Sequence, residues 1–245
     1  MNQIALISGA SGGIGQAIAL ALAAEGMQVA AGYYQNEQAA AQVVAKCEQQ
    51  GVAAIAVRCD VSDRESVKAA YDRVVDKLGF PSILVHAAGI SQFGLIQDMT
   101  DEQFDQVMDV HVRGAFYLIK RGLPALIQRK NGRIILISSI WGSVGAAGEV
   151  LYSAAKGAIN SFTKALAKEL APSRITVNAV APGAVQTEML ARQLDEQEQQ
   201  ALLAEIPMGR FGRAAEIASL VAYLCREEAG YLTGQVLHVN GGWYL

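Results

Sequence analysis

Short apolar runs alternate with longer amphipathic stretches along almost the whole chain. The apolar runs have the length and composition of buried strands, and they lie at residues 4–8, 27–33, 52–59, 82–89, 132–138, 175–182 and 235–240. Apolar positions at helical spacing fill the stretches between them, at residues 14–25, 36–50, 63–78, 101–129 and 152–170, and on both sides of Pro207. Strand and helix in regular alternation predict a parallel sheet of about seven strands with helices on both faces.

Capping residues support these boundaries and leave little room for a second domain. Asp63 and Thr100 stand where helices should begin, and Pro172 stands where one should end. No linker rich in Pro, Gly or Ser interrupts the series, and 245 residues with 52% hydrophobic content can bury one large core. We therefore expect residues 1–245 to form a single α/β domain with the doubly wound Rossmann fold. The charge-rich segment 190–212 breaks the rhythm and is either a lid over a cleft or a solvated surface helix.

Charge and composition exclude several classes of function. The net charge is -3 and no Lys or Arg precedes Lys46, so the chain has no basic field for nucleic acid. The three Cys and three His lack metal-ligand spacing, which indicates reduced thiols and no metal site. No long uncharged apolar run suits a membrane span, and no targeting pattern precedes the first strand. These features predict a cytoplasmic protein.

A glycine-rich turn joins the first predicted strand to the first helix. Its glycines allow close backbone approach, and its N–H groups can meet a pyrophosphate at the helix N-terminus. The turn therefore predicts a dinucleotide site. Its candidate cofactor-binding residues are Gly9, Ser11, Gly12, Gly13, Ile14 and Gly15.

The end of the second strand bears on which nicotinamide cofactor would bind. No acid occurs in residues 30–36, so nothing there repels a 2′-phosphate, and no Arg or Lys occurs there to attract one. Selectivity would then rest on Ser11, Tyr33, Asn36 and backbone donors. We predict NADPH, with NADH as the alternative.

Two further strand ends offer cofactor contacts. Asp60 could accept a hydrogen bond from an adenine amino group, with the amide of Val61 beside it, or Asp60 could simply start the next helix. Ala88 and Gly89 are small residues where a cofactor ribose would pass, although loop glycines are as often turn residues.

One spacing indicates acid/base chemistry. Tyr152 follows Ser139 by 13 positions, and Lys156 follows Tyr152 by four. On a helix, residues four apart stand on one face, so the phenol and the ammonium would share a site. A free Tyr keeps its proton up to roughly pH 10, and a nearby cation would lower that pKa. The pair would then give and take protons near neutrality.

Taken together, these motifs resemble the short-chain dehydrogenase/reductase superfamily from residue 4 to residue 244. The resemblance implies that the carboxamide of the cofactor is fixed by Pro182, Gly183, Val185 and Thr187. It also implies a catalytic set in which Ser139 holds a carbonyl oxygen, Tyr152 protonates it, and Lys156 lowers the Tyr pKa and grips the ribose hydroxyls. Members of this family are usually homotetramers, with the helices of 101–129 and 152–170 pairing between subunits.

The chain departs from the family at one catalytic position. Where the family usually has an Asn that holds a relay water, residues 109–113 place His111. His111 would either relay protons or be a buried structural histidine. A histidine pKa near 6.5 would make turnover sensitive to pH.

Resemblance also suggests the carbonyl substrate. The C-terminal segment and the Ser139 region are most similar to bacterial 3-oxoacyl-acyl-carrier-protein reductases of fatty acid biosynthesis. In that branch the acidic carrier protein docks on arginines beside the cleft, and Arg129 and Arg174 stand at the matching positions.

Two alternatives stay open. Trp141 in SSIWG, Glu149 and NGGWY resemble reductases that complete the 5-aminopentanol modification of elongation factor P. Glu149 would then pair with the substrate ammonium, or else be a solvated acid at a helix start. The other alternative is a nucleotide-binding protein without catalysis.

Overall fold

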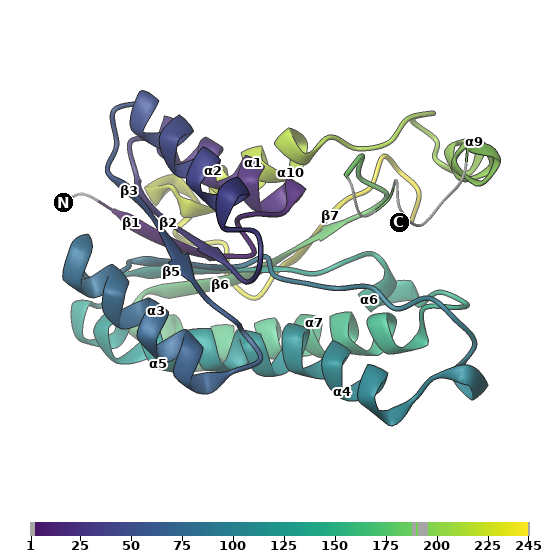
Figure 1. The fold of residues 1–245 in the computed structure, drawn as a ribbon, viewed down its shortest axis with the longest axis horizontal. Coiled ribbons are helices and arrows are strands. Elements are labelled where there is room, and N and C mark those ends of the chain that lie inside the picture. The colour runs from purple at the N-terminus through teal and green to yellow at the C-terminus, as the bar shows by residue number, and fades with distance from the viewer. Residues whose placement is uncertain (1–2, 188–189, 191–195, 245) are drawn as a thin grey trace.

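The computed structural model of the chain describes residues 3–187, 190 and 196–244 (Figure 1). At its centre lies a sheet of seven parallel strands in the order β3-β2-β1-β4-β5-β6-β7. The strands are β1 (Ile4–Ser8), β2 (Gln28–Tyr33), β3 (Ala54–Arg58), β4 (Ile83–His86), β5 (Gly132–Ile137), β6 (Ile175–Pro182) and β7 (Val236–Val239). The strand order reverses between β1 and β4, as in a doubly wound fold, so the predicted Rossmann architecture is confirmed.

Helices cover both faces of the sheet, and Figure 1 shows α1, α2 and α10 above it with α3, α5 and α7 below. The described helices are α1 (Gly13–Ala24), α2 (Glu37–Gln49), α3 (Arg64–Lys77), α4 (Asp101–Met108), α5 (Gly114–Arg129), α6 (Trp141–Val144), α7 (Val150–Leu170), α9 (Glu196–Glu205) and α10 (Ala214–Cys225). None of them combines the length and the apolar character needed to cross a membrane.

Burial on both faces explains why the central strands read as continuous apolar runs. All five residues of β1 and all eight of β6 are buried, as expected for parallel strands between two helical layers. Alternate residues enter two cores. On β1, for example, Ala5 and Ile7 pack with α1 and α10, whereas Ile4 and Leu6 pack with α3 and α5.

The predicted helix 101–129 is interrupted by one wide turn. Between α4 and α5 the backbone forms a π-helical turn, Asp109–Arg113, which contains His111. On one side of the turn Val107 packs on α7, and on the other Ala115 packs toward the sheet. The extra residue of a π turn lets the two halves bury different faces, which a continuous α-helix could not do here.

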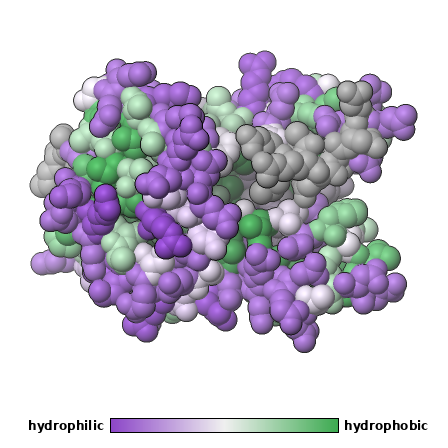
Figure 2. Space-filling view, viewed as in Figure 1, coloured by the Kyte–Doolittle hydropathy of each residue, from purple (hydrophilic) through white to green (hydrophobic). Residues whose placement is uncertain are grey.

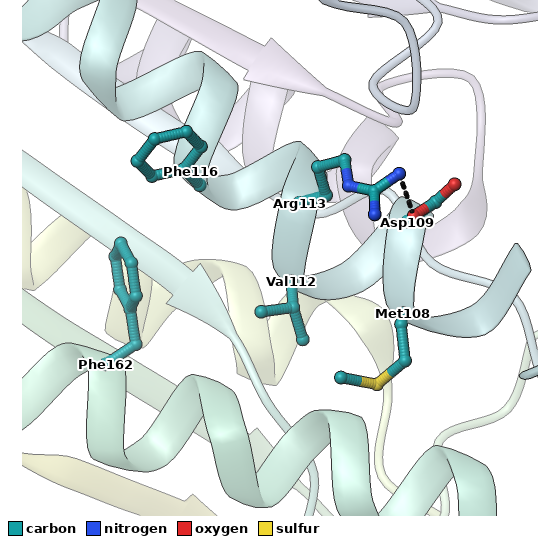
Figure 3. Close-up of a pocket in the computed structure, with 6 residues that line it drawn as sticks. All are labelled: Met108, Asp109, Val112, Arg113, Phe116 and Phe162. Atoms are coloured by element: carbon teal, nitrogen blue, oxygen red, sulfur yellow. Dashed lines mark ion pairs between the residues drawn. The ribbon is translucent and has the colours of Figure 1, made fainter. Parts of the chain in front are cut away.

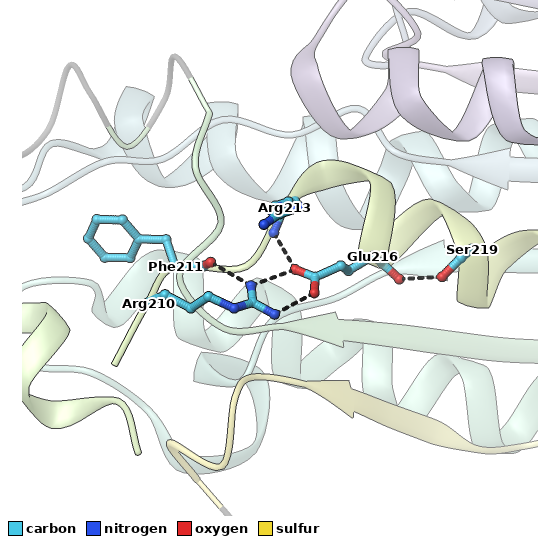
Figure 4. Close-up of polar contacts among 5 residues, drawn as sticks. All are labelled: Arg210, Phe211, Arg213, Glu216 and Ser219. Carbon is cyan, nitrogen blue, oxygen red and sulfur yellow. Dashed lines mark hydrogen bonds and ion pairs between the residues drawn. The ribbon is translucent and has the colours of Figure 1, made fainter. Parts of the chain in front are cut away.

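The described part of the predicted lid is anchored at its C-terminal end. Residues 188–189 and 191–195 lie outside the described residues, and α9 follows them. The indole N–H of Trp243 donates to Glu205 at the end of α9 (3.2 Å). Further along, the Arg210 guanidinium donates twice to Glu216 (2.6 and 2.9 Å), at the start of α10 (Figure 4). The role of this segment as a lid stays a prediction.

Truncating a buried side chain at the centre of the sheet should lower the stability of the protein considerably. Ile135 on β5 is fully buried, so Ile135→Ala should lower the free energy of unfolding by about 2–5 kcal/mol. Ile96→Ala is the matched control, because Ile96 is 58% exposed and its truncation should change stability by no more than about 0.5 kcal/mol. Urea unfolding measures both, and equal losses would contradict the placement of β5.

Candidate active site

The structure brings Ser139, Tyr152 and Lys156 together at the carboxyl edge of the sheet. Ser139 follows β5, while Tyr152 and Lys156 lie one turn apart on α7. The Lys156 Nζ atom is 5.3 Å from the centroid of the Tyr152 ring. The Ser139 and Tyr152 side chains share a hydrogen bond, and Ser139 Oγ also accepts from the backbone N–H of Trp141 (3.2 Å). The predicted set therefore forms one cluster.

Lys156 is buried almost completely, at 4% exposure, and its ammonium donates to the carbonyl of Ile137 at the end of β5 (2.7 Å). Burial lowers the pKa of Lys156 to about 7, because the charged form loses its hydration. α6 leaves no space beside it, since a Cβ on Gly142 would lie 2.6 Å from the Lys156 carbonyl carbon. Lys156 is thus held in place and only partly charged near neutrality.

The pKa of Tyr152 is raised in this structure, contrary to the sequence-based expectation that Lys156 lowers it. Burial is the main cause, the Glu149 carboxylate adds to it, and the hydrogen bond with Ser139 acts in the opposite direction. Lys156 does not contribute to the shift of the Tyr152 pKa. The phenol therefore keeps its proton at neutral pH, which suits a proton donor.

His111 lies against the phenol. The two rings meet edge to face with centroids 5.4 Å apart, and His111 is 1% exposed. Its Nε2 lies 2.7 Å from the Ile90 carbonyl oxygen and 3.2 Å from the Ile90 backbone nitrogen. Because the carbonyl can only accept and its contact is the shorter one, we assign the proton to Nε2. Nδ1 is then a buried acceptor, and it has no partner in the described part of the chain.

The expected pH sensitivity of His111 does not hold. Burial first, and then the nearby Lys156, lower the pKa of His111 well below its usual value. The imidazole is therefore neutral throughout the physiological range. Of the two groups, Lys156 is the one that titrates near pH 7.

Glu149 stands at the start of α7, close enough to raise the pKa of Tyr152. It is partly buried, it accepts from Ser91 Oγ (3.4 Å), and it forms no ion pair within the described residues. Burial raises its own pKa, while the Ser91 hydrogen bond lowers it. Glu149 is therefore not the fully solvated acid that the sequence allowed as an alternative.

Trp141 belongs to an aromatic cluster that joins the C-terminal segment to the site. Its ring contacts Trp243 (5.0 Å between centroids) and Tyr244 (5.5 Å), both edge to face. Since Trp141 directly follows the Ser139 turn, this cluster forms one wall beside the catalytic residues. The sequence had indicated Trp141 and the NGGWY motif separately, and the structure brings them into contact.

Hydrophobic side chains also reach the surface near this edge. Figure 2 shows them gathered at the right-hand end of the lower half, where the labels of α4 and α6 stand in Figure 1. The segment after β4 contributes three exposed large side chains, Phe93, Leu95 and Ile96.

The glycine turn fits the diphosphate of a dinucleotide. Gly9 has φ +70°, and a Cβ there would lie 2.6 Å from the backbone nitrogen of Ala88. A Cβ on Gly15 would lie 2.1 Å from the Gly9 carbonyl oxygen. Gly12 and Gly13 are exposed, and Gly12 offers α1 no side-chain cap, which leaves first-turn N–H groups for an anion.

The second cofactor segment lies against the first. Thr187 Cγ2 would be 3.2 Å from a Cβ on Gly13, so the turn and the segment after β6 touch. Pro182 accepts from the Ile140 N–H (3.0 Å), Gly183 donates to Val239 (3.0 Å), and Val185 pairs with Gly212 in an isolated bridge. This arrangement brings together residues that the sequence had placed in one site.

The predicted contacts to the adenosine half gather at the ends of β2 and β3, and some of their polar atoms already have partners. Asn36 Oδ1 caps α2 by accepting from Ala39 N–H (3.0 Å). Asp60 Oδ1 accepts from the Ser62 hydroxyl (2.6 Å) and N–H (3.0 Å). Asp60 thus shapes the loop before α3, while its other oxygen is left for an adenine.

Arg129 and Arg174 are not beside the cleft of a single chain. α5 runs antiparallel to the strands, so its last residue, Arg129, lies at the edge where β5 begins, and Arg174 directly precedes β6 at that same edge. Arg129 donates to the carbonyl of Phe80 (3.1 Å) and lies over its ring. The sheet separates both arginines from Ser139.

Comparisons with known proteins show which family the chain resembles. A sequence model of the family described as Enoyl-(Acyl carrier protein) reductase matches residues 9–244. The chain is 45% identical over 245 residues to an uncharacterized oxidoreductase, YmfI, of Bacillus subtilis (strain 168), covering 100% of each. It is 41% identical to the 3-oxoacyl-[acyl-carrier-protein] reductase FabG of Staphylococcus aureus (strain N315), covering 100% of this chain and 99% of the relative. The same reductase of Escherichia coli (strain K12) is 39% identical, with 100% and 98% covered.

The buried ammonium predicts a pH-dependent stability. Lys156 has a pKa of about 7 when folded and an ordinary one near 10.5 when unfolded. Between these values the unfolded chain binds more protons, so the contribution of Lys156 to the free energy of unfolding grows as pH rises. The free energy of unfolding of the wild type minus that of Lys156→Met should therefore rise by roughly 2–3 kcal/mol between about pH 7 and about pH 9.5, measured in urea.

Lys164→Met serves as the control, because Lys164 is exposed on the same helix. The free energy of unfolding of the wild type minus that of Lys164→Met should not change over the same pH range. A flat difference for Lys156→Met as well would contradict the buried, partly charged lysine.

Proposed function

Because the chain belongs to the short-chain dehydrogenase/reductase family, we propose that it reduces the keto group of a 3-oxoacyl thioester on acyl carrier protein, with NADPH as reductant. It is an NAD(P)-dependent oxidoreductase. The observation that carries the proposal is the geometry of the cluster, in which the Tyr152 phenol is hydrogen-bonded to Ser139 and lies beside the buried Lys156. The names of the 39–41% identical relatives supply the substrate class.

Each residue of the cluster has a role in carbonyl reduction. Bound NADPH would supply the hydride. The Ser139 hydroxyl would hold the carbonyl oxygen, and Tyr152 would donate its proton as negative charge develops there. A raised phenol pKa is suited to this direction, because an alkoxide is a stronger base than a phenolate and still takes the proton. Lys156 would hold the ribose and help return a proton to Tyr152.

His111 is proposed to take part in that return. Its neutral ring has one nitrogen bonded to Ile90, and the other is a buried acceptor that has no partner among the described residues. A water bonded to Nδ1 would lie beside Tyr152 and could connect it to solvent. This is the water-holding role that the family usually gives to Asn.

The cofactor would lie between the two loops that touch at Gly13 and Thr187. The glycine turn would hold the pyrophosphate, the ends of β2 and β3 the adenosine, and the segment after β6 the carboxamide. The preference for NADPH over NADH rests on the absence of an acid within residues 30–36, and the first carboxylate after them, Glu37, is bonded to the Tyr33 hydroxyl.

A second candidate substrate is a ketone that carries an amine, as in the modification of elongation factor P. Glu149 favours it, because this carboxylate is partly buried near Tyr152 and forms no ion pair within the described residues. A substrate ammonium would satisfy it. A nucleotide-binding protein without catalysis is the third reading, and it has no observation in its favour beyond His111.

The proposal includes a homotetramer. A pocket of about 350 Å³ opens on the outer face of α4, α5 and α7, and Figure 3 shows Phe116 and Phe162 facing each other across it. Phe116 is 42% exposed, as is usual for an apolar residue that a second subunit covers. Acyl carrier protein as a docking partner and the cytoplasmic location stay predictions.

Removing the phenol hydroxyl should abolish most of the activity. With NADPH and a short 3-oxoacyl thioester, Tyr152→Phe should lower kcat/KM by about 10²–10⁴-fold, because the proton donor is lost. Tyr231→Phe is the matched control, since Tyr231 is fully exposed and its change should leave the rate intact. NADPH oxidation followed by absorbance measures both. A Tyr152→Phe variant as fast as the wild type would refute the assignment, and a wild type inactive on every carbonyl tested would favour the non-catalytic reading.

Substrate charge separates the two enzyme candidates. If the substrate carries an amine, Glu149→Gln should lower kcat/KM about tenfold for an aminoketone relative to a neutral ketone of equal length. The ratio is the useful readout, since any change in the Tyr152 pKa affects both substrates alike. Glu228→Gln, an exposed control, should leave the ratio unchanged. An unchanged ratio for Glu149→Gln would remove the pairing and leave the 3-oxoacyl thioester.

A further inference from the structure

An arginine stands at the end of the strand next to β2. In the parallel pair of β2 and β3, Tyr33 lies directly opposite Arg58, and the Cys59 N–H donates to the Tyr33 carbonyl (2.6 Å). Residues in register point to the same face of a sheet, so these two side chains leave it side by side. Arg58 was not apparent from the sequence, because only strand pairing brings it to the end of β2.

This edge is continuous with the glycine turn. The N–H of Ala10 donates to the carbonyl of Gly32 (2.8 Å), which fixes the turn on the end of β2. Asp60 and Val61, the proposed adenine contacts, follow Arg58 after one residue. A dinucleotide that extends from the turn to Asp60 must therefore pass the ends of β2 and β3.

The Arg58 guanidinium is accessible to a ligand at this edge of the sheet. Arg58 is exposed, and it makes no ion pair within the described residues. The Tyr33 hydroxyl bonds to Glu37. Burial and Glu37 raise the pKa of Tyr33, whereas Arg58 and, from α3, Arg73 lower it, so both guanidinium groups lie within electrostatic reach of the hydroxyl.

We propose that Arg58 binds the 2′-phosphate of NADPH and sets the preference for the phosphorylated cofactor. A guanidinium matches a phosphate with two parallel hydrogen bonds and keeps its charge at every physiological pH. Asn36 supports it, because its Oδ1 is used in capping α2 while its amide N–H groups have no acceptor in the described part of the chain. The inference rests on the proposed dependence on NADPH.

Binding of cofactor fragments tests the inference without catalysis. Adenosine 2′,5′-bisphosphate and 5′-AMP differ only in the 2′-phosphate, and isothermal titration gives the affinity of the purified protein for each. The wild type should prefer the bisphosphate. Arg58→Gln should lose about tenfold or more of its affinity for the bisphosphate and keep its affinity for 5′-AMP. Arg58→Lys, which keeps the charge without the paired donors, should lie between them.

Arg73→Gln is the matched control, because it removes an exposed guanidinium that also acts on the Tyr33 hydroxyl but belongs to α3 and not to β3. It should keep most of the preference for the bisphosphate. An equal loss in both glutamine variants would indicate a general positive field and overturn the contact with Arg58.

The outcomes distinguish a failure of the Arg58 contact from a failure of the dependence on NADPH. If the wild type prefers the bisphosphate and Arg58→Gln keeps that preference, the role of Arg58 is wrong and NADPH dependence stands. If the wild type binds both fragments equally, NADPH dependence fails, and the role of Arg58 fails with it. A parallel loss of 5′-AMP affinity in Arg58→Gln would show a disturbed site rather than a lost phosphate contact, which also overturns the inference.

Discussion

The hydrogen bond from the Lys156 ammonium to the Ile137 carbonyl is the constraint on which the site depends. It ties α7 to the end of β5, and those two elements supply Tyr152 and Ser139. Placing the ammonium there removes it from water and lowers the pKa of Lys156. Burial likewise raises the pKa of the neighbouring Tyr152 phenol. Both effects have one cause, which is the burial of the cluster between helix and sheet.

The distribution of small residues follows from the same crowding. α6 touches α7 at Gly142 because a side chain there would overlap the backbone of Lys156. On the cofactor side, Gly9 meets Ala88, and Gly13 meets Thr187. Three segments distant in sequence can therefore close around one cleft only where side chains are missing. Positions that look like loop glycines in the sequence are contacts between loops in the structure.

Much of the fold and the catalytic cluster was predictable from the sequence, since strand and helix periodicity and the Tyr152–Lys156 spacing are local patterns. Effects that depend on burial or on pairing between strands were not. The predicted direction of the Tyr152 pKa shift was wrong, because burial is the main influence on the phenol and the neighbouring Lys156 does not contribute to the shift. Arg129 looked like a residue beside the cleft until the direction of α5 placed it at the opposite edge of the sheet.

The π-helical turn at residues 109–113 acts as a joint between two surfaces with different tasks. Each residue of an α-helix rotates the chain by about 100°, so the single additional residue sets the angle between the faces of α4 and α5. α4 packs on α7 at the mouth of the cleft, and α5 packs on the sheet. Deleting one residue from the π-helical turn would make α4 and α5 one continuous α-helix. The deletion would also turn His111 away from the phenol of Tyr152. The local irregularity is therefore the feature that lets one helical stretch pack on α7 at one end and on the sheet at the other.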